Sequence, residues 1–227
     1  MRALVFDFDG LILDTETPEF TVWNQIFAEH GVEMPSDYWI QVIGRGAEQQ
    51  IERPPELLTR LTGSYVETES ARLERRGRIL ELIQREQARP GVVSLLDQAR
   101  EAGVPAAIAS SSRHEWVDGF VDRLGLLDRF QAILCADDVQ RAKPFPDLYL
   151  LACERLQAEP THSIALEDSP NGIAAAKSAG LFTIAVPNSV TANLDLSAAD
   201  LRIDDLSTVQ IELLASRSLG RWNRGDR

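Results

Sequence analysis

Short apolar runs recur along the chain and predict the strands of a buried sheet. Strands that are covered on both faces form nearly continuous apolar runs, whereas half-exposed strands alternate apolar and polar residues. The runs in this chain are of the continuous kind. They are Ala3–Phe6, Pro105–Ala109, Ala132–Leu134, Ser163–Leu166, Thr183–Val186 and the weaker Leu201–Ile203.

Segments with helical periodicity separate these runs. Gly103, Gly125 and Gly180 follow the last periodic residue of some of them, where glycine commonly ends a helix. The predicted helices are Val92–Glu101, Glu115–Leu124, Asp147–Leu156, Ile173–Ala179 and Leu206–Leu214. Strands that alternate with helices imply right-handed crossovers between parallel strands. We therefore expect an α/β fold with a Rossmann-like parallel sheet between two layers of helices.

Residues 16–88 interrupt this alternation and contain no convincing strand. Helical periodicity is present at Glu19–His30, Pro54–Leu61 and Glu67–Ile83. We expect a helical cap domain at residues 16–88, inserted into a catalytic core made of residues 1–15 and 89–227. Because the insertion directly follows the first strand, it should lie over the carboxyl end of the sheet, where open α/β sheets bind ligands. Trp23 is expected in the core of this cap.

Two carboxylates, Asp7 and Asp9, follow the first apolar run directly, and Gly10 then allows the backbone to turn. Two acids crowded at a strand end are costly unless a cation or a proton compensates them. The pattern is consistent with a metal site that includes a nucleophilic or acid–base carboxylate. It is also consistent with a loop whose acids are merely solvated.

Polar clusters follow three more apolar runs. Ser110, Ser111 and Ser112 could bind a phosphate oxygen, although Ser112 could instead cap the helix that follows. Lys143 precedes a proline and could neutralise a phosphate or a carboxylate. Glu167 and Asp168 are hard oxygen donors that suit Mg²⁺, and Asp168 could alternatively cap a helix. His114 is interpreted as a helix-start residue.

Composition limits the classes of partner. The 227 residues carry a net charge of −12, so nucleic acid, a polyanion, is not an expected partner. No run approaches the length of a membrane span, and a cytoplasmic location is expected. Cys135 and Cys153 have no ligand spacing and are expected to be reduced core residues. The arginine-rich end, Arg217–Arg227, is interpreted as a poorly packed tail.

Taken together, these motifs resemble those of the haloacid dehalogenase superfamily of phosphotransferases. The resemblance is closest to the branch of β-phosphoglucomutase and small-sugar phosphatases and extends to about residue 213. The run Asp7-Phe8-Asp9-Gly10-Leu11-Ile12-Leu13-Asp14-Thr15-Glu16 carries it most specifically. Ser110, Lys143-Pro144 and Glu167-Asp168-Ser169-Pro170-Asn171-Gly172 match the later motifs of the family.

The resemblance implies a role for each of these residues. Asp7 would attack phosphorus, and Asp9 would protonate the leaving alcohol and later activate water. Mg²⁺ would bind Asp7, the backbone carbonyl of Asp9, and Asp168, with Glu167 as a ligand or close neighbour. The transferring phosphoryl group would be held by Ser110, Ser111 and Lys143. Asp9 stands where the dehalogenases have serine or threonine, which favours phosphoryl transfer over dehalogenation.

The cap departs from the mutase pattern at the positions that bind substrate. Glu19 stands where the mutases have a histidine, and Ile43 and Ala47 occupy two basic positions of their substrate loop. Gly44 and Arg45 of that loop remain candidate substrate-binding residues together with Glu19. These departures favour a phosphatase for a small phosphorylated metabolite, such as a sugar phosphate. A sugar-phosphate mutase is the alternative, followed by a non-catalytic metabolite-binding protein, and we expect a monomer or weak dimer.

Overall fold

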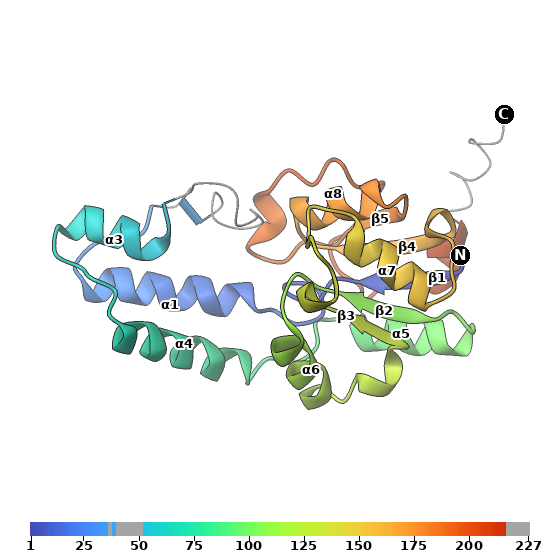
Figure 1. Cartoon of the computed structure of the whole chain (residues 1–227), viewed down its shortest axis with the longest axis horizontal. Helices are drawn as coiled ribbons and strands as arrows, with labels where there is room; N and C mark the ends of the chain where they lie inside the picture. Colours follow the sequence, from blue (N-terminus) through green and yellow to red (C-terminus); the bar gives the residue numbers. More distant parts are fainter. Residues whose placement is uncertain (36–37, 40–51, 217–227) are drawn as a thin grey trace.

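A six-stranded parallel sheet forms the centre of the protein, as predicted. The computed structural model describes residues 1–35, 38–39 and 52–216 (Figure 1). The spatial order of the strands is β3-β2-β1-β4-β5-β6, so β1 lies at the middle of the sheet. The strands are β1 (Ala3–Phe6), β2 (Ala106–Ala109), β3 (Ala132–Leu134), β4 (Ser163–Glu167), β5 (Phe182–Ala185) and β6 (Leu201–Arg202).

Helices cover both faces of the sheet. Alternate residues of β1 enter different cores, because side chains of a strand point to opposite faces. Leu4 and Phe6 pack with α5 (Val92–Glu101) and α6 (His114–Arg123). Ala3 and Val5 pack on the other face with α7 (Asp147–Arg155) and α8 (Pro170–Ser178). The prediction of a Rossmann-like sheet between two helical layers is confirmed.

Helices from the predicted insertion lie at one end of the sheet (Figure 1). They are α1 (Glu16–Glu29), α3 (Pro54–Thr62) and α4 (Glu69–Ile83). These helices share a hydrophobic core of their own, which includes Trp23, Phe27 and Leu58. Trp23 is 1% exposed, so its expected place in the cap core is confirmed.

The two chain segments that join these helices to the sheet run side by side. Leu13 forms an antiparallel bridge with Ala88, and the backbone N–H of Arg89 donates to the carbonyl of Ile12 at 2.8 Å. The Arg89 side chain donates to the carbonyls of Gly10, Val186 and Pro187. The entry and the exit of the helical insertion are therefore anchored together at the carboxyl end of β1.

Helix α1 begins at Glu16, three residues before its predicted start at Glu19, and two helices of the core also begin three or more residues from their predicted first residue. The predicted helix Leu206–Leu214 begins later, because residues 206–208 form a turn and the helical residues are 211–216. The Asp205 carboxylate accepts the N–H of Ser207 at 2.6 Å, a local bond that competes with helix formation. Helix α8 begins at Pro170 instead of Ile173, since proline suits the first turn of a helix.

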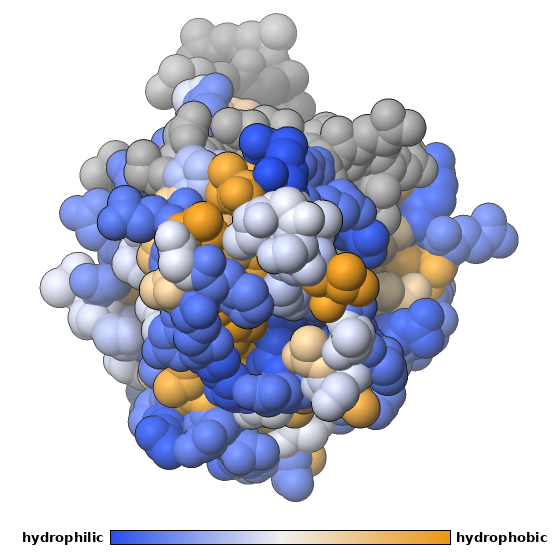
Figure 2. Space-filling model, turned by 90° about the vertical axis from the view of Figure 1, so that its left-hand side faces the viewer, coloured by the Kyte–Doolittle hydropathy of each residue, from blue (hydrophilic) through white to orange (hydrophobic). Residues whose placement is uncertain are grey.

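Both cysteines are free and buried, as expected for core residues. Among the described residues, no helix combines the length and the apolar character that crossing a membrane requires. The end of the molecule that carries the inserted helices is largely hydrophilic, with hydrophobic residues in small separate groups (Figure 2).

Candidate active site

Four predicted residues from three loops of the core meet at the carboxyl end of the sheet. Asp7 follows β1, Glu167 ends β4, and Asp168 comes next in the chain. Carboxylate oxygens of these three residues lie within 4.8 Å of one another, and the residues are 6%, 0% and 1% exposed. The Lys143 ammonium forms ion pairs with Asp7 and with Glu167, the latter at 2.6 Å. The sequence pattern alone had placed these groups only at separate strand ends.

The buried cluster carries more negative than positive charge, since three carboxylates share one ammonium. Burial raises the pKa of Asp7 well above its ordinary value, with Lys143 opposing this shift and Glu167 adding to it. Burial and the neighbouring acids likewise raise the pKa of Asp168. Burial lowers the pKa of Lys143, but the two carboxylates outweigh it and raise that pKa overall. Clustered oxygen donors with excess negative charge fit a hard divalent cation such as Mg²⁺.

Glu167 is held by hydrogen bonds on both of its oxygens. Oε1 accepts from the Tyr149 hydroxyl at 2.7 Å as well as from Lys143. Oε2 accepts from the backbone N–H groups of Asp168 and Ser169 and from the Ser169 hydroxyl. A Cβ atom at Gly172 would come within 1.7 Å of Oε1, so only glycine fits beside this carboxylate. Glu167 is therefore placed to orient Lys143 toward Asp7.

Ser169 supplies the cap of α8. Its hydroxyl accepts the N–H of Gly172 at 3.1 Å. The alternative that Asp168 caps this helix is therefore wrong, and the Asp168 carboxylate instead faces Asn188.

Asn188 joins the core to the inserted helices and was missed by the sequence reasoning. Its amide donates to Asp168 at 2.8 Å and to Glu16, the first residue of α1, at 2.8 Å. Burial raises the pKa of Glu16 to about 7, although the hydrogen bond from Asn188 acts to lower it. A Cβ at Gly10, whose φ is +78°, would come within 2.3 Å of the Asp168 carboxylate. In the sequence, Asn188 is marked only as a polar residue two positions after the predicted strand Thr183–Val186.

Asp9 lies on the other side of the β1 loop and accepts from a different set of donors. Its Oδ2 accepts from the hydroxyls of Ser112 at 2.6 Å and Ser110 at 3.3 Å. Its Oδ1 accepts from the Trp116 indole Nε1 at 2.9 Å, a contact that sequence reasoning did not anticipate. The alternative that Ser112 caps α6 is wrong, because the cap residue is Arg113 and the Ser112 hydroxyl bonds Asp9.

A cavity of about 500 Å³ lies between α4 and α6. Arg76 and Leu80 line it from α4, and Trp116 and Phe120 line it from α6. Ser111 and Ser112 are among the other residues that line it. Since Ser112 and Trp116 also bond Asp9, the cavity and the candidate acid–base carboxylate share one wall.

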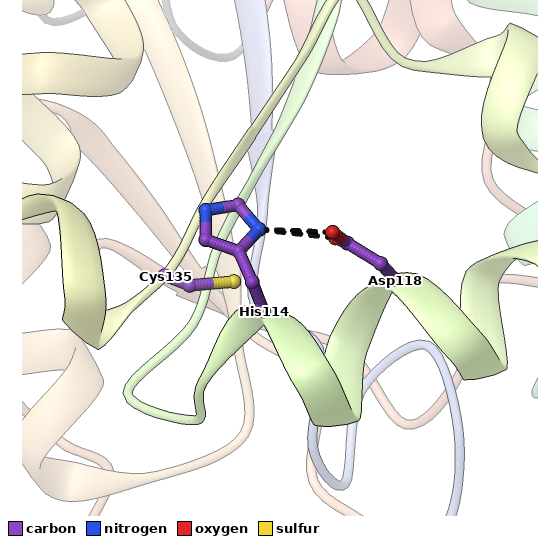
Figure 3. Close-up of side chains that lie close together, drawn as sticks. All are labelled: His114, Asp118 and Cys135. Atoms are coloured by element: carbon purple, nitrogen blue, oxygen red, sulfur yellow. Dashed lines mark hydrogen bonds and ion pairs between the residues drawn. The ribbon is translucent and has the colours of Figure 1, made fainter.

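A second polar cluster surrounds the start of α6 (Figure 3). His114 and Asp118 come from α6, and Cys135 reaches them from the end of β3. The two imidazole nitrogens contact Asp118 at 3.1 Å and Asp138 at 2.8 Å. Burial lowers the pKa of His114, but the two carboxylates outweigh it and raise that pKa overall. Burial raises the pKa of the Cys135 thiol to about 12, so the thiol stays protonated and this cluster is best described as an ion-pair network.

His114 is the first residue of α6, in agreement with its interpretation as a helix-start residue.

The predicted substrate-binding residues of the cap are only partly described. Glu19 lies in α1, where burial raises its pKa, with Arg75 opposing and Asp9 adding to the shift. Gly44 and Arg45, like Ile43 and Ala47, lie outside the described residues. Glu19 is therefore the one candidate of this group that the described structure places within electrostatic reach of Asp9.

Comparison with known proteins gives consistent matches over most of the chain. Residues 1–180 match the haloacid dehalogenase-like hydrolase family. YhcW of Bacillus subtilis (strain 168), which its name describes as a candidate phosphatase, is 43% identical and covers 94% of this chain and 96% of its own. The β-phosphoglucomutase of the same strain is 30% identical over 94% of each chain. The crystal structure of CbbY from Rhodobacter sphaeroides in complex with phosphate is 27% identical, with a TM-score of 0.69, and covers 92% of this chain and 96% of its own.

Proposed function

Because the chain belongs to the haloacid dehalogenase-like hydrolases, we propose that it is a Mg²⁺-dependent phosphatase for a small phosphate monoester, such as a sugar phosphate. The observation that carries this proposal is the buried contact of Lys143 with Asp7 and Glu167, beside Asp168. Phosphoryl transfer needs mainly positioning and charge stabilisation, and this cluster can provide both. The catalytic core comprises residues 1–15 and 89–227, and residues 16–88 form the cap that selects the substrate.

Asp7 acts as the nucleophile. One of its carboxylate oxygens attacks phosphorus, the bond from phosphorus to the alcohol oxygen breaks, and an aspartyl-phosphate forms. Asp9 gives its proton to the departing alcohol oxygen in the same step. Asp9 then removes a proton from water while the water oxygen attacks phosphorus, and the bond to Asp7 breaks. Inorganic phosphate and the free Asp7 carboxylate are the products.

Lys143 and the serines hold the transferring group. The Lys143 ammonium lies beside Asp7 and offsets the repulsion between an anionic nucleophile and an anionic phosphate. Glu167 fixes the ammonium from the opposite side, so its substitution should displace Lys143. Asp7, Asp168 and the backbone carbonyl of Asp9 would hold Mg²⁺, which supplies positive charge at the phosphate oxygens when it is bound. Ser110 and Ser111 are proposed to contact the phosphoryl oxygens.

The cavity between α4 and α6 is the proposed site for the alcohol portion of the substrate. Two of its lining residues, Ser112 and Trp116, hydrogen-bond Asp9, from which the leaving oxygen must receive its proton. Its wall combines the aromatic side chains of Trp116 and Phe120 with the guanidinium of Arg76. This surface suits a polar metabolite with a ring or carbon skeleton of modest size.

The decisive experiment is a screen of phosphorylated metabolites for release of inorganic phosphate in the presence of Mg²⁺. Substitution of Asp7 by Asn should lower turnover of every substrate by at least about 10³-fold, because the covalent step is lost. Asp118→Asn is the matched control, since it makes the same chemical change in the ion-pair network and should remain active. Comparable turnover by the Asp7 and Asp118 variants would contradict the proposal.

A sugar-phosphate mutase is the second candidate, because a β-phosphoglucomutase is among the relatives. A mutase and a phosphatase share the attack by Asp7 and differ in the acceptor of the phosphoryl group. Incubation with a hexose 1-phosphate should yield free phosphate from a phosphatase and a hexose 6-phosphate from a mutase. Predominant formation of the 6-phosphate would replace our proposal by the mutase.

A further inference from the structure

The Asp9 carboxylate accepts hydrogen bonds on both oxygens from chemically different donors. Oδ1 accepts from the Trp116 indole N–H at 2.9 Å. Oδ2 accepts from the Ser112 hydroxyl at 2.6 Å and from Ser110 at 3.3 Å. The proposed function requires this carboxyl group to carry a proton in one step and to accept one in the next. The donors around it therefore decide where that proton can reside.

An indole N–H can only donate, whereas a serine hydroxyl can donate or accept after rotation. A proton on Oδ2 can be accommodated, because Ser110 and Ser112 can turn their hydroxyls and accept from it. A proton on Oδ1 would face the indole N–H, which offers no acceptor. The contact with Trp116 thus favours Oδ1 as the permanent acceptor and Oδ2 as the oxygen that carries the proton.

We propose that Trp116 is a positioning residue for the acid–base chemistry of Asp9. Its indole N–H holds Oδ1 while the two serine hydroxyls hold Oδ2, so the carboxyl group is kept in one orientation. This inference rests on the proposed phosphatase function and gives Trp116 a role beyond lining the cavity. Trp116 belongs to the core helix α6 and lines the cavity beside α4. The same side chain therefore contacts both the acid and the proposed site of the leaving alcohol.

The packing of Trp116 supports a fixed orientation of its indole. The ring lies against Phe120 in an edge-to-face arrangement, with centroids 4.8 Å apart and an angle of 69° between the planes. Phe120 is buried and lies one helical turn further along α6, so it restricts the tryptophan without contacting Asp9 through a polar atom. The N–H is consequently presented to Oδ1 by a side chain that is itself packed.

The test compares two substrates with wild-type protein and the Trp116→Phe variant. An alkyl phosphate needs a proton on its leaving oxygen, whereas p-nitrophenyl phosphate releases an anion that is stable without one. The variant should lose roughly tenfold in kcat/KM for the alkyl phosphate. Its loss for p-nitrophenyl phosphate should be several-fold smaller than for the alkyl phosphate, because that leaving group needs no proton. Equal losses for the two substrates would overturn the positioning role.

Phe120→Leu is the matched control. It changes the same wall of the cavity and the packing of the indole, but it removes no hydrogen bond to Asp9. Any loss in this variant should be the same for the two substrates. A loss confined to the alkyl phosphate in Phe120→Leu, and absent in Trp116→Phe, would assign the effect to packing and contradict the proposal.

A second measurement serves if Trp116→Phe fails to fold. The indole N–H resonance of Trp116, observed by NMR, should show slow exchange in wild-type protein and fast exchange in Asp9→Ala. Unchanged exchange in Asp9→Ala would overturn the proposed bond. Failure of the phosphatase function itself has a different signature, since wild-type protein would then release phosphate from neither substrate, and the role of Trp116 would fall with it.

Discussion

The two ionic clusters of the core contain similar charged side chains, but they differ in burial and therefore in electrostatic cost. The cluster of Asp7, Glu167, Asp168 and Lys143 is almost fully buried and has an excess of negative charge. The network at the start of α6 pairs one imidazole with two carboxylates that are 52% and 31% exposed. Water screens the second network, so its charges need no further partner. The first cluster is electrostatically unfavourable on its own, and binding of a divalent cation would relieve this cost.

The largest effect is expected from Lys143→Met, which removes the cation of the buried cluster. Turnover should fall by about 10³-fold or more, because Asp7 and the phosphate lose their shared counter-charge. Without divalent ions, the free energy of unfolding should fall by about 3–5 kcal/mol, as expected when one partner of a buried ion pair is removed. The measurement is urea unfolding at neutral pH.

The matched change in the exposed network is Asp118→Asn, whose stability should stay within about 1 kcal/mol of wild type. The loss of stability in Lys143→Met should become smaller at low pH. The pKa values of Asp7 and Asp168 are raised, so these carboxylates take up protons there and no longer need a counter-charge. Similar losses for the Lys143 and Asp118 variants would show that burial does not distinguish the two clusters.

The next effect is stabilisation by Mg²⁺. At about 100 times its dissociation constant, an ion that binds only the folded chain adds about 2.7 kcal/mol to stability. For a protein of this size that corresponds to an increase in Tm of roughly 5–10 °C. Differential scanning calorimetry with and without the ion measures it.

The stability of Asp168→Asn should differ from that of wild type both without and with Mg²⁺. It should be at least as stable without the ion, because one buried negative charge has been removed. It should gain little from Mg²⁺, because a proposed ligand has been lost. A full Mg²⁺-dependent increase in this variant would exclude Asp168 as a ligand.

The smallest effect concerns the pH dependence of the network around His114. The carboxylates raise the pKa of His114 above its value in the unfolded chain. The resulting stability is therefore complete below about pH 6.5 and is lost as the pH rises through the raised pKa. His114→Gln should be less stable than wild type by about 1 kcal/mol or less at pH 6, because the ring is partly exposed. The two proteins should converge at pH 9 in urea titrations, and a constant difference would point to packing instead of charge.

The order of strands and helices could be predicted because each buried element is encoded locally. Apolar runs such as Ala3–Phe6 mark a strand that is covered on both faces, and the acids that follow it mark its carboxyl end. Parallel pairing then brings Asp7 and Glu167 to the same edge of the sheet. The candidate site was therefore largely accessible from sequence wherever a polar residue directly followed a strand.

Residues that complete the site from within a helix, and not from a strand end, could not be found in this way. Tyr149 lies on the buried face of α7 and has the pattern of an ordinary core residue, yet its hydroxyl bonds Glu167. Trp116 lies in the first turn of α6, and its bond to Asp9 depends on how that helix packs. Ser112 shows a different limit of the sequence. A serine just before a helix often caps it, but here the cap position falls on Arg113, and the Ser112 hydroxyl donates to Asp9.

The paired connections between the sheet and the helical insertion have a consequence for protein engineering. Because Leu13 pairs with Ala88 and Ile12 with Arg89, the insertion starts and ends at adjacent points. A grafted module needs only two neighbouring attachment points, and exchange at such sites disturbs the host fold little. Transplanting the corresponding segment of a relative at this junction should therefore change which metabolites are accepted while leaving the phosphorus chemistry to its host.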